Sequence, residues 1–259
     1  MRAALSGLRL AVGTLTMVPV GSVEPPSRRS AAWAMSLAPM AVLPLAIAAG
    51  AVGWLGGLAR LPTLVVAALV LMALGLGSRA MHLDGLADTV DGIGAGWSRQ
   101  RALDVMQRGD VGPMGVAAVA LTLLVQAGAA AAILERPEGW LLVALAVVVS
   151  RGSCALTCAR GIPAARPEGM GALVAGTVPL PALAFVLVAS ATVLGVTTQA
   201  AHAGSGLAAV AVLAMTLVVA LLIRISTRVF GGVSGDVMGA AIELSLAALL
   251  VTLSAGLGR

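Results

Sequence analysis

The sequence predicts an all-α fold, a polytopic bundle of transmembrane helices. Hydrophobic residues make up 59% of the chain and charged residues only 10%, which leaves too little polar surface for a protein dissolved in water. Apolar segments of about 20 residues, the length that crosses a ~30 Å hydrocarbon core, recur along the sequence. We therefore expect residues 1–259 to form a single integral membrane domain.

Hydropathy predicts about seven spans and an N-terminal segment that lies in the interface or is re-entrant. The spans cover residues 31–57, 62–81, 113–134, 139–158, 172–195, 206–228 and 237–257. Arg9 interrupts the weaker apolar stretch at 5–20, which also leaves an eighth span open. Pro39 and Pro44 in the first span indicate either a kink or two tolerated membrane prolines.

The basic residues indicate topology and not nucleic-acid binding. The net charge is +5, yet the arginines are scattered between apolar spans instead of forming a basic stripe beside aromatic residues. With the N-terminus inside, most of them fall in cytoplasmic loops, as the positive-inside rule requires. Cys154 and Cys158 have no Cys or His companions at metal-ligand spacing, so we expect two small core residues.

The stretch at 82–92, directly after the second span, carries the strongest chemical signal. In a helix, Asp84, Asp88 and Asp91 lie at i, i+4 and i+7 and share one face. Three adjacent carboxylates repel one another unless a cation neutralises them, and Mg²⁺ prefers oxygen ligands together with substrate phosphates. The alternative is a solvated acidic loop. His82 is a candidate general base or a hydrogen-bonding residue at a helix end.

Two further clusters contain charged residues beside glycines. Asp236 follows a glycine-rich loop before the last span, where it indicates either an anion-binding loop or a simple helix cap. Glu243 lies seven residues later and is expected to face the bundle interior. Arg151 lies inside its span, so its partner is either a carboxylate such as Glu243 or a substrate phosphate, and both interpretations stay open.

Four motifs together resemble one enzyme family. They are HLDGLADTVDG at 82–92, RGDVGPMG at 108–115, SRG at 150–152 with RPEGMG at 166–171, and GGVSGDVMGAAIE at 231–243. They are similar to cobalamin synthase, the adenosylcobinamide-GDP ribazoletransferase of bacterial cobalamin biosynthesis. The resemblance is weakest over 1–80 and 172–225. Many relatives read Asp-Ser-Arg where this chain reads Arg108-Gly-Asp110, which leaves open which of these two charged residues performs the family's role.

The resemblance implies a multi-pass, Mg²⁺-dependent enzyme of the bacterial inner membrane, with its N-terminus and active site on the cytoplasmic side. The implied reaction joins adenosylcobinamide-GDP to α-ribazole or its 5′-phosphate, releases GMP and gives adenosylcobalamin or its 5′-phosphate. On this basis we expect Asp84, Asp88 and Asp91 to hold Mg²⁺, with these aspartates or His82 as the base for an attacking hydroxyl. The expected substrate-binding residues are Arg108, Asp110, Arg151, Arg160, Arg166, Asp236 and Glu243.

Three other classes of protein stay open from the sequence alone. A secondary transporter would place ionisable groups near the bilayer midplane, whereas these acids lie mostly at one membrane face. Residues 88–92 also resemble part of the aspartate motif of CDP-alcohol phosphotransferases, and a noncatalytic scaffold is the third alternative. The expected partners are the two substrates and the lipid bilayer. A homo-oligomer, or association with other cobalamin-assembly enzymes, is left open.

Overall fold

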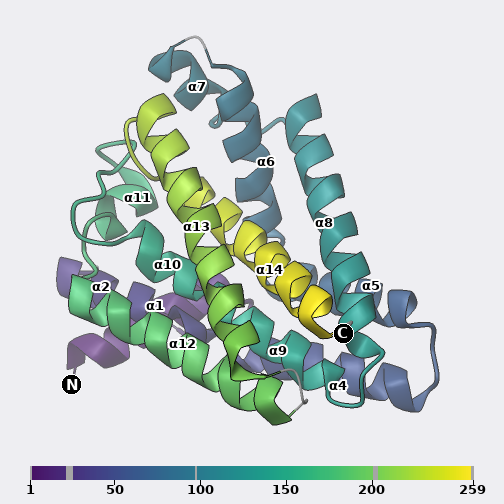
Figure 1. The fold of residues 1–259 in the computed structure, drawn as a ribbon. Helices are drawn as coiled ribbons and strands as arrows, with labels where there is room; N and C mark the ends of the chain where they lie inside the picture. Colours follow the sequence, from purple (N-terminus) through teal and green to yellow (C-terminus); the bar gives the residue numbers. More distant parts are fainter. Residues whose placement is uncertain (1, 22–25, 97, 201–203, 258–259) are drawn as a thin grey trace.

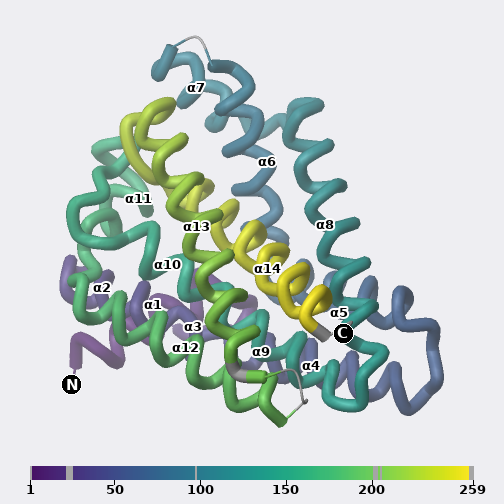
Figure 2. The backbone as a smooth tube through the Cα atoms, viewed as in Figure 1, coloured from purple at the N-terminus to yellow at the C-terminus, as the bar shows by residue number. Residues whose placement is uncertain are grey.

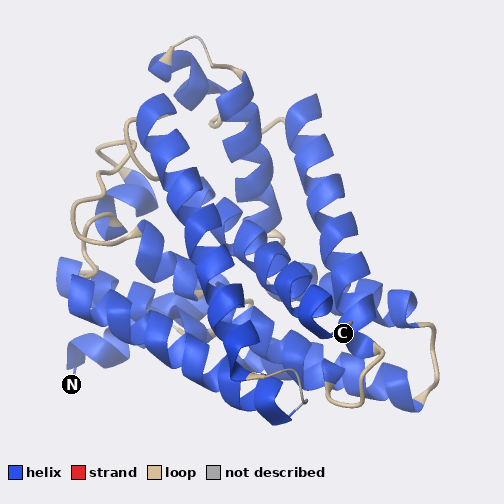
Figure 3. Cartoon of the chain, in the orientation of Figure 1, coloured by secondary structure: helices blue, strands red, loops and turns tan. Residues whose placement is uncertain are grey.

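The computed structural model describes residues 2–21, 26–96, 98–200 and 204–257, which form fourteen helices and no strand (Figures 1 and 3). The helices are α1 (Arg2–Leu15), α2 (Arg28–Ser36), α3 (Ala38–Ala41), α4 (Leu43–Leu58), α5 (Thr63–Gly77), α6 (Met81–Gly94), α7 (Arg99–Val105), α8 (Pro113–Leu134), α9 (Gly139–Ser150), α10 (Gly152–Thr157), α11 (Gly169–Val174), α12 (Leu180–Ala200), α13 (Ser205–Val229) and α14 (Gly235–Leu257). The all-α membrane fold expected from the sequence is confirmed.

The described residues include five helices long and apolar enough to cross a membrane, with α9 and α10 counted as one. The bent pair of α5 and α6 makes a sixth if it is one span. The expected count of about seven was therefore approximate. The largest difference is at 31–57, where α2, α3 and α4 replace one long helix. Pro39 and Pro44 each stand in the first turn of a new helix, where a missing N–H costs nothing.

The N-terminal helix α1 is too short to be an eighth span. It has 14 residues, which at about 1.5 Å per residue give a length of roughly 21 Å, less than the ~30 Å hydrocarbon core. It packs against α2 and α3 through Gly7, Ala11 and Leu15. This short packed helix agrees with the expected interfacial or re-entrant segment.

A sharp break between α5 and α6 directs the aspartate-bearing helix toward the bundle centre. The two helix axes differ by 88°. Arg79 and Ala80 adopt left-handed backbone conformations with φ of 57° and 55°, which cost about 1–2 kcal/mol each for residues with a Cβ. Contacts with the last turn of α1 and the segment after it hold the turn, because Arg79 donates to the Gly13 carbonyl at 2.9 Å and the Met17 N–H donates to the Gly77 carbonyl at 2.7 Å.

Helix α14 is the central element of the bundle. It packs against α6, α8, α9 and α13, and Figure 2 shows it running diagonally between α13 and α8. Its contact with α6 is close at Gly85, where an added Cβ would lie 2.7 Å from the Asp236 carbonyl oxygen. This glycine lets the backbone of α6 approach the first turn of α14, which brings the acidic residues of the two helices together.

Candidate functional site

The acids of α6 and α14 meet at a cavity of about 320 Å³, here called the acidic cavity. Its lining includes Arg79, His82, Asp84, Met170, Asp236 and Gly239. Asp84 is exposed, and Asp88, one turn further along α6, is half-buried. Two of the three aspartates expected from the sequence therefore lie at or beside one cavity, and Asp236 joins them from the other end of the chain.

Like charges dominate this region. The Asp88 carboxylate interacts electrostatically with Asp84, Asp236 and Asp91, and the Arg166 guanidinium offsets part of that repulsion. Arg166 also attracts Asp236, and its guanidinium is fixed by donating to the Leu103 carbonyl at 2.8 Å. Arg166 was expected to bind substrate, and the structure places it beside these acids.

The loop before α14 positions Asp236 through backbone pairing. The Val233 N–H donates to Pro163 at 2.9 Å, and the Ala165 N–H donates back to Val233 at 2.9 Å. Ser234, and not Asp236, accepts the N–H of Val237 and so caps the helix. The Ser234 hydroxyl donates to the Asp236 carboxylate at 3.1 Å. Ser234 therefore holds the cap position expected as one alternative for Asp236, and the Asp236 carboxylate interacts electrostatically with Asp84 and Asp88.

Asp91 is engaged by the chain itself, unlike Asp84 and Asp88. Its two carboxylate oxygens accept the backbone N–H groups of Gly112 at 2.7 Å and Gly115 at 2.9 Å. These groups belong to the first turn of α8, where four N–H donors lack intrahelical partners. A Cβ added at Gly112 would lie 2.5 Å from an Asp91 oxygen, which explains a glycine there. Asp91 thus fastens α6 to the start of α8.

A cage of three protein ligands is not present in the described part of the chain. Within residues 2–21, 26–96, 98–200 and 204–257, no three His, Cys, Asp or Glu side chains are arranged to hold a metal ion. The shared helical face expected for Asp84, Asp88 and Asp91 exists, but the outer two point to different neighbours. Both oxygens of Asp91 already accept backbone N–H groups, which leaves Asp84 and Asp88 as the carboxylates of this face without a hydrogen-bond donor in the described residues.

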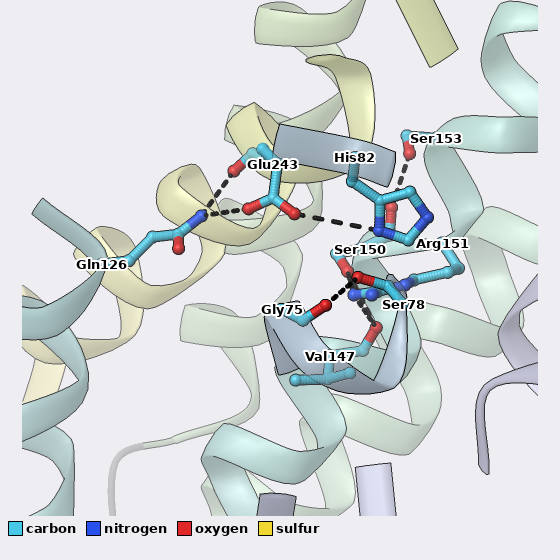
Figure 4. Close-up of polar contacts among 9 residues, drawn as sticks. All are labelled: Gly75, Ser78, His82, Gln126, Val147, Ser150, Arg151, Ser153 and Glu243. Atoms are coloured by element: carbon cyan, nitrogen blue, oxygen red, sulfur yellow. Dashed lines mark hydrogen bonds and ion pairs between the residues drawn. The ribbon is translucent and has the colours of Figure 1, made fainter. Parts of the chain in front are cut away.

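A second polar cluster lies inside the bundle next to the acidic cavity (Figure 4). Glu243 accepts the Gln126 side-chain N–H at 2.9 Å and lies 3.9 Å from His82 Nδ1. Arg151, 1% exposed, donates to Ser150 at 2.8 Å and is attracted by the Glu243 charge.

The cavity beside Arg151 and Glu243 measures about 10 Å³, the volume of roughly one water molecule. The structure therefore favours a carboxylate partner for Arg151 over a substrate phosphate. His82 is 4% exposed, and in Figure 4 its Nδ1 is turned toward Glu243, 3.9 Å away, while the other ring nitrogen points away from that carboxylate.

The other expected residues lie apart from the acidic cavity. Arg108 and Asp110 are exposed on the loop between α7 and α8. Arg160 lines a different cavity, described below. Cys154 and Cys158 are free and fully buried, which confirms that they are core residues.

Arg79 is the site residue that sequence reasoning missed. It lines the acidic cavity although it belongs to the turn between α5 and α6. The available signal was a charged residue at the end of a long apolar segment, three positions before His82. The predicted span 62–81 absorbed this arginine, because nothing in the local sequence marks the left-handed turn.

The family match and the similar curated proteins indicate the same family. The chain matches the cobalamin-5-phosphate synthase family over residues 7–254. A protein of Nocardioides sp. named adenosylcobinamide-GDP ribazoletransferase is 44% identical over 95% of this chain and 97% of its own. Proteins with the same name from Frankia casuarinae (37% identity; 95% of this chain, 93% of the relative) and Bradyrhizobium diazoefficiens (33%; 100% and 97%) are also similar. No solved structure matches. The chain belongs to the cobalamin-5-phosphate synthase family.

Proposed function

We propose that this chain joins adenosylcobinamide-GDP to α-ribazole or α-ribazole 5′-phosphate, releases GMP, and gives adenosylcobalamin or its 5′-phosphate. This is the late nucleotide-loop assembly step of cobalamin biosynthesis. One observation carries the proposal: Asp84 of α6, Asp236 of α14 and Arg79 line one cavity, and Asp88 and the Arg166 guanidinium interact electrostatically with its acids. The family to which the chain belongs supports the choice of substrates.

The charges at this cavity suit a magnesium ion shared with the substrate. Asp84 and Asp236 line the cavity with Arg79, and Asp88 and Arg166 interact electrostatically with these acids, so three carboxylates against two guanidinium groups leave a net negative charge in this region. A diphosphate ester, itself an anion, would increase that repulsion. Mg²⁺ usually binds one or two carboxylates and completes its shell with substrate phosphates and water, so Asp84 and Asp88 fit without a third protein ligand. When bound, the ion would polarise the diphosphate and stabilise GMP as leaving group.

The two arginines are the proposed phosphate ligands on the protein. Charge-assisted hydrogen bonds from guanidinium groups to phosphate oxygens are short and strong. Arg79 lines the cavity from the turn before α6, and Arg166, on the loop before α11, attracts Asp236 electrostatically, so the two belong to different elements. The diphosphate is thereby oriented with GMP as the group to be displaced.

The proton balance assigns a role to Asp236. A product that keeps the 5′-phosphate requires a ribose hydroxyl as nucleophile. Its oxygen bonds to the phosphorus on the cobinamide side, the bond from that phosphorus to GMP breaks, and the hydroxyl proton must go to a base. Asp236 lies on α14, opposite the proposed metal pair, and Ser234 orients its carboxylate. We assign the base to Asp236 instead of His82, because His82 is buried and its Nδ1 lies 3.9 Å from Glu243.

The proposed location is the bacterial cytoplasmic membrane with the acidic cavity on the cytoplasmic side. The arginines at 99, 101, 108, 160 and 166 lie on the segments 95–112 and 158–168. Figure 1 shows α7 and α11, which border these segments, at the end of the bundle away from the C-terminus. The positive-inside rule places such a basic end in the cytoplasm.

Product analysis with the purified full-length protein tests the proposed function. Supplied with adenosylcobinamide-GDP, α-ribazole 5′-phosphate and Mg²⁺ in lipid nanodiscs, the protein should release GMP and form adenosylcobalamin 5′-phosphate, both identified by mass spectrometry. Asp84→Asn and Asp88→Asn should each lower the rate at least 100-fold. The matched control is Asp104→Asn, because Asp104 is exposed on α7 and its carboxylate accepts a hydrogen bond from the Gln100 side chain, away from the acidic cavity. Full activity of both site variants, or release of CMP from a CDP-linked substrate instead, would contradict the proposal.

A further inference from the structure

A second and larger cavity, of about 760 Å³, lies between α2 and the first turns of α12. We call it the arginine cavity, because Arg28, Arg29 and Arg160 line it together with apolar side chains of α12. Helix α11 separates it from the acidic cavity: Met170 at the start of α11 lines the acidic one, and Gly176, just after α11, lines this one. Figure 1 shows α2, α11 and the beginning of α12 as neighbours at one edge of the bundle.

The arginine cavity is positively charged. Among residues 2–21, 26–96, 98–200 and 204–257, no carboxylate forms an ion pair with Arg28, Arg29 or Arg160. Among the described residues, Arg28 is the one of the three whose guanidinium donates a hydrogen bond to the backbone, to the Ala175 carbonyl at 3.1 Å. Three cations around one volume therefore lack a protein counter-charge, and the cavity is complementary to an anion.

The opposite wall of this cavity is apolar and belongs to a membrane span. Ala182, Phe185 and Val186 of α12 line it, and Phe185 is 74% exposed. Helix α12 is one of the helices able to cross the bilayer, so this exposed face meets lipid. Trp33, which is 42% exposed on α2, also lines the cavity and is a residue typical of the membrane interface.

We propose that the arginine cavity binds an anionic phospholipid. The phosphate lies among Arg28, Arg29 and Arg160, and an acyl chain follows the apolar face of α12 past Phe185. Basic pockets between transmembrane helices on the cytoplasmic side are suited to anionic head groups. The volume is within the range of about 300–1,000 Å³ that holds a ligand head group. The reacting diphosphate is assigned elsewhere, because none of the cavity's lining residues is a carboxylate that could share a metal ion with it.

Native mass spectrometry of the full-length protein in mild detergent tests this proposal. The protein is titrated with dioleoyl phosphatidylglycerol or with dioleoyl phosphatidylcholine, which share acyl chains and phosphate but differ in net charge. The wild type should bind the anionic lipid at least tenfold more tightly. Substituting glutamine at Arg28, Arg29 and Arg160 together should remove that preference.

The matched control removes three charges outside the cavity. Glutamine substitutions at the exposed residues Arg60, Arg101 and Arg228 should leave the preference within twofold of wild type. If the triple cavity variant does not fold, Arg29→Gln alone decides the question, because the Arg29 side chain donates to no other part of the described chain. A loss of at least threefold in anionic-lipid affinity is then expected.

Three results would overturn the lipid assignment. The first is equal binding of the two lipids by the wild type, which means unselective annular lipid. The second is unchanged selectivity in the cavity variants. The third is displacement of the bound lipid by adenosylcobinamide-GDP, together with a raised KM for that substrate in Arg29→Gln, which makes the cavity a substrate subsite. Because the lipid measurements need no turnover, they stand whether or not the proposed reaction is correct.

Discussion

Asp91 offers a quantitative test of which aspartates serve the fold and which serve a ligand. Its carboxylate, 9% exposed, accepts N–H groups from Gly112 and Gly115 at 2.7 and 2.9 Å. A hydrogen bond to a charged group contributes about 1.5–3 kcal/mol. Asp91→Asn keeps one neutral acceptor and turns an NH₂ toward the other N–H. We therefore expect the free energy of unfolding to fall by about 2–4 kcal/mol.

The assay separates this anchoring role from metal binding. Thermal unfolding in detergent should occur at a clearly lower temperature for Asp91→Asn, while the Mg²⁺ concentration that gives half-maximal GMP release stays within twofold of wild type. Asp88→Asn should show the reverse pattern, with near-normal unfolding and a Mg²⁺ requirement raised at least tenfold.

Gly115→Ala is the matched control for this anchor. It keeps the carboxylate, but its methyl group would overlap the Asp91 side chain, so it should reproduce the loss of stability. An Asp91→Asn protein with wild-type stability and a raised Mg²⁺ requirement would refute the anchoring role and return Asp91 to the metal site.

Three other perturbations follow from the same structure. Ala80→Gly should raise the unfolding temperature, because glycine removes about 1 kcal/mol of cost at a φ of 55°; an unchanged or lower temperature would contradict the left-handed turn. Gly85→Ala should reduce GMP release at least tenfold with unchanged helical circular dichroism, because its methyl group would lie 2.7 Å from the Asp236 carbonyl oxygen. Arg151→Met should destabilise the protein by about 1–3 kcal/mol, because it removes the donor to the buried Ser150 hydroxyl and the cation that attracts Glu243. Adding Glu243→Gln should recover at least half of that loss, and no recovery would show that the two charges are uncoupled.

The bounds of a helix were predictable where hydropathy alone determines them. The spans expected at 113–134, 206–228 and 237–257 agree with α8, α13 and α14 to within two residues at each end. The prediction was less accurate at 31–57, because a proline in an apolar segment can kink one helix or begin another, and composition does not distinguish the two.

The break between α5 and α6 was not predictable from local sequence. Arg79 and Ala80 are ordinary residues in a left-handed conformation that usually requires glycine. The contacts that stabilise it come from Gly13 and Met17, more than 60 residues earlier in the chain. Tertiary contacts of this kind leave no periodic signal, so the span was predicted to run straight through the turn.

The same limit applies to the site: the local sequence predicts which residues share a helical face, but not which distant residues they contact. Spacing placed three aspartates on one helical face, but it could not say what each would meet. Asp91 accepts hydrogen bonds from backbone groups 21 and 24 residues away, and Glu243 accepts one from a glutamine 117 residues away. Asp84 and Asp88 have no such donor in the described part of the chain, and they lie at or beside the cavity shared by α6 and α14. Because a diphosphate has the same sign of charge as these acids, its binding there should be unfavourable without a divalent cation. Substrate affinity, and not only turnover, should therefore depend on Mg²⁺.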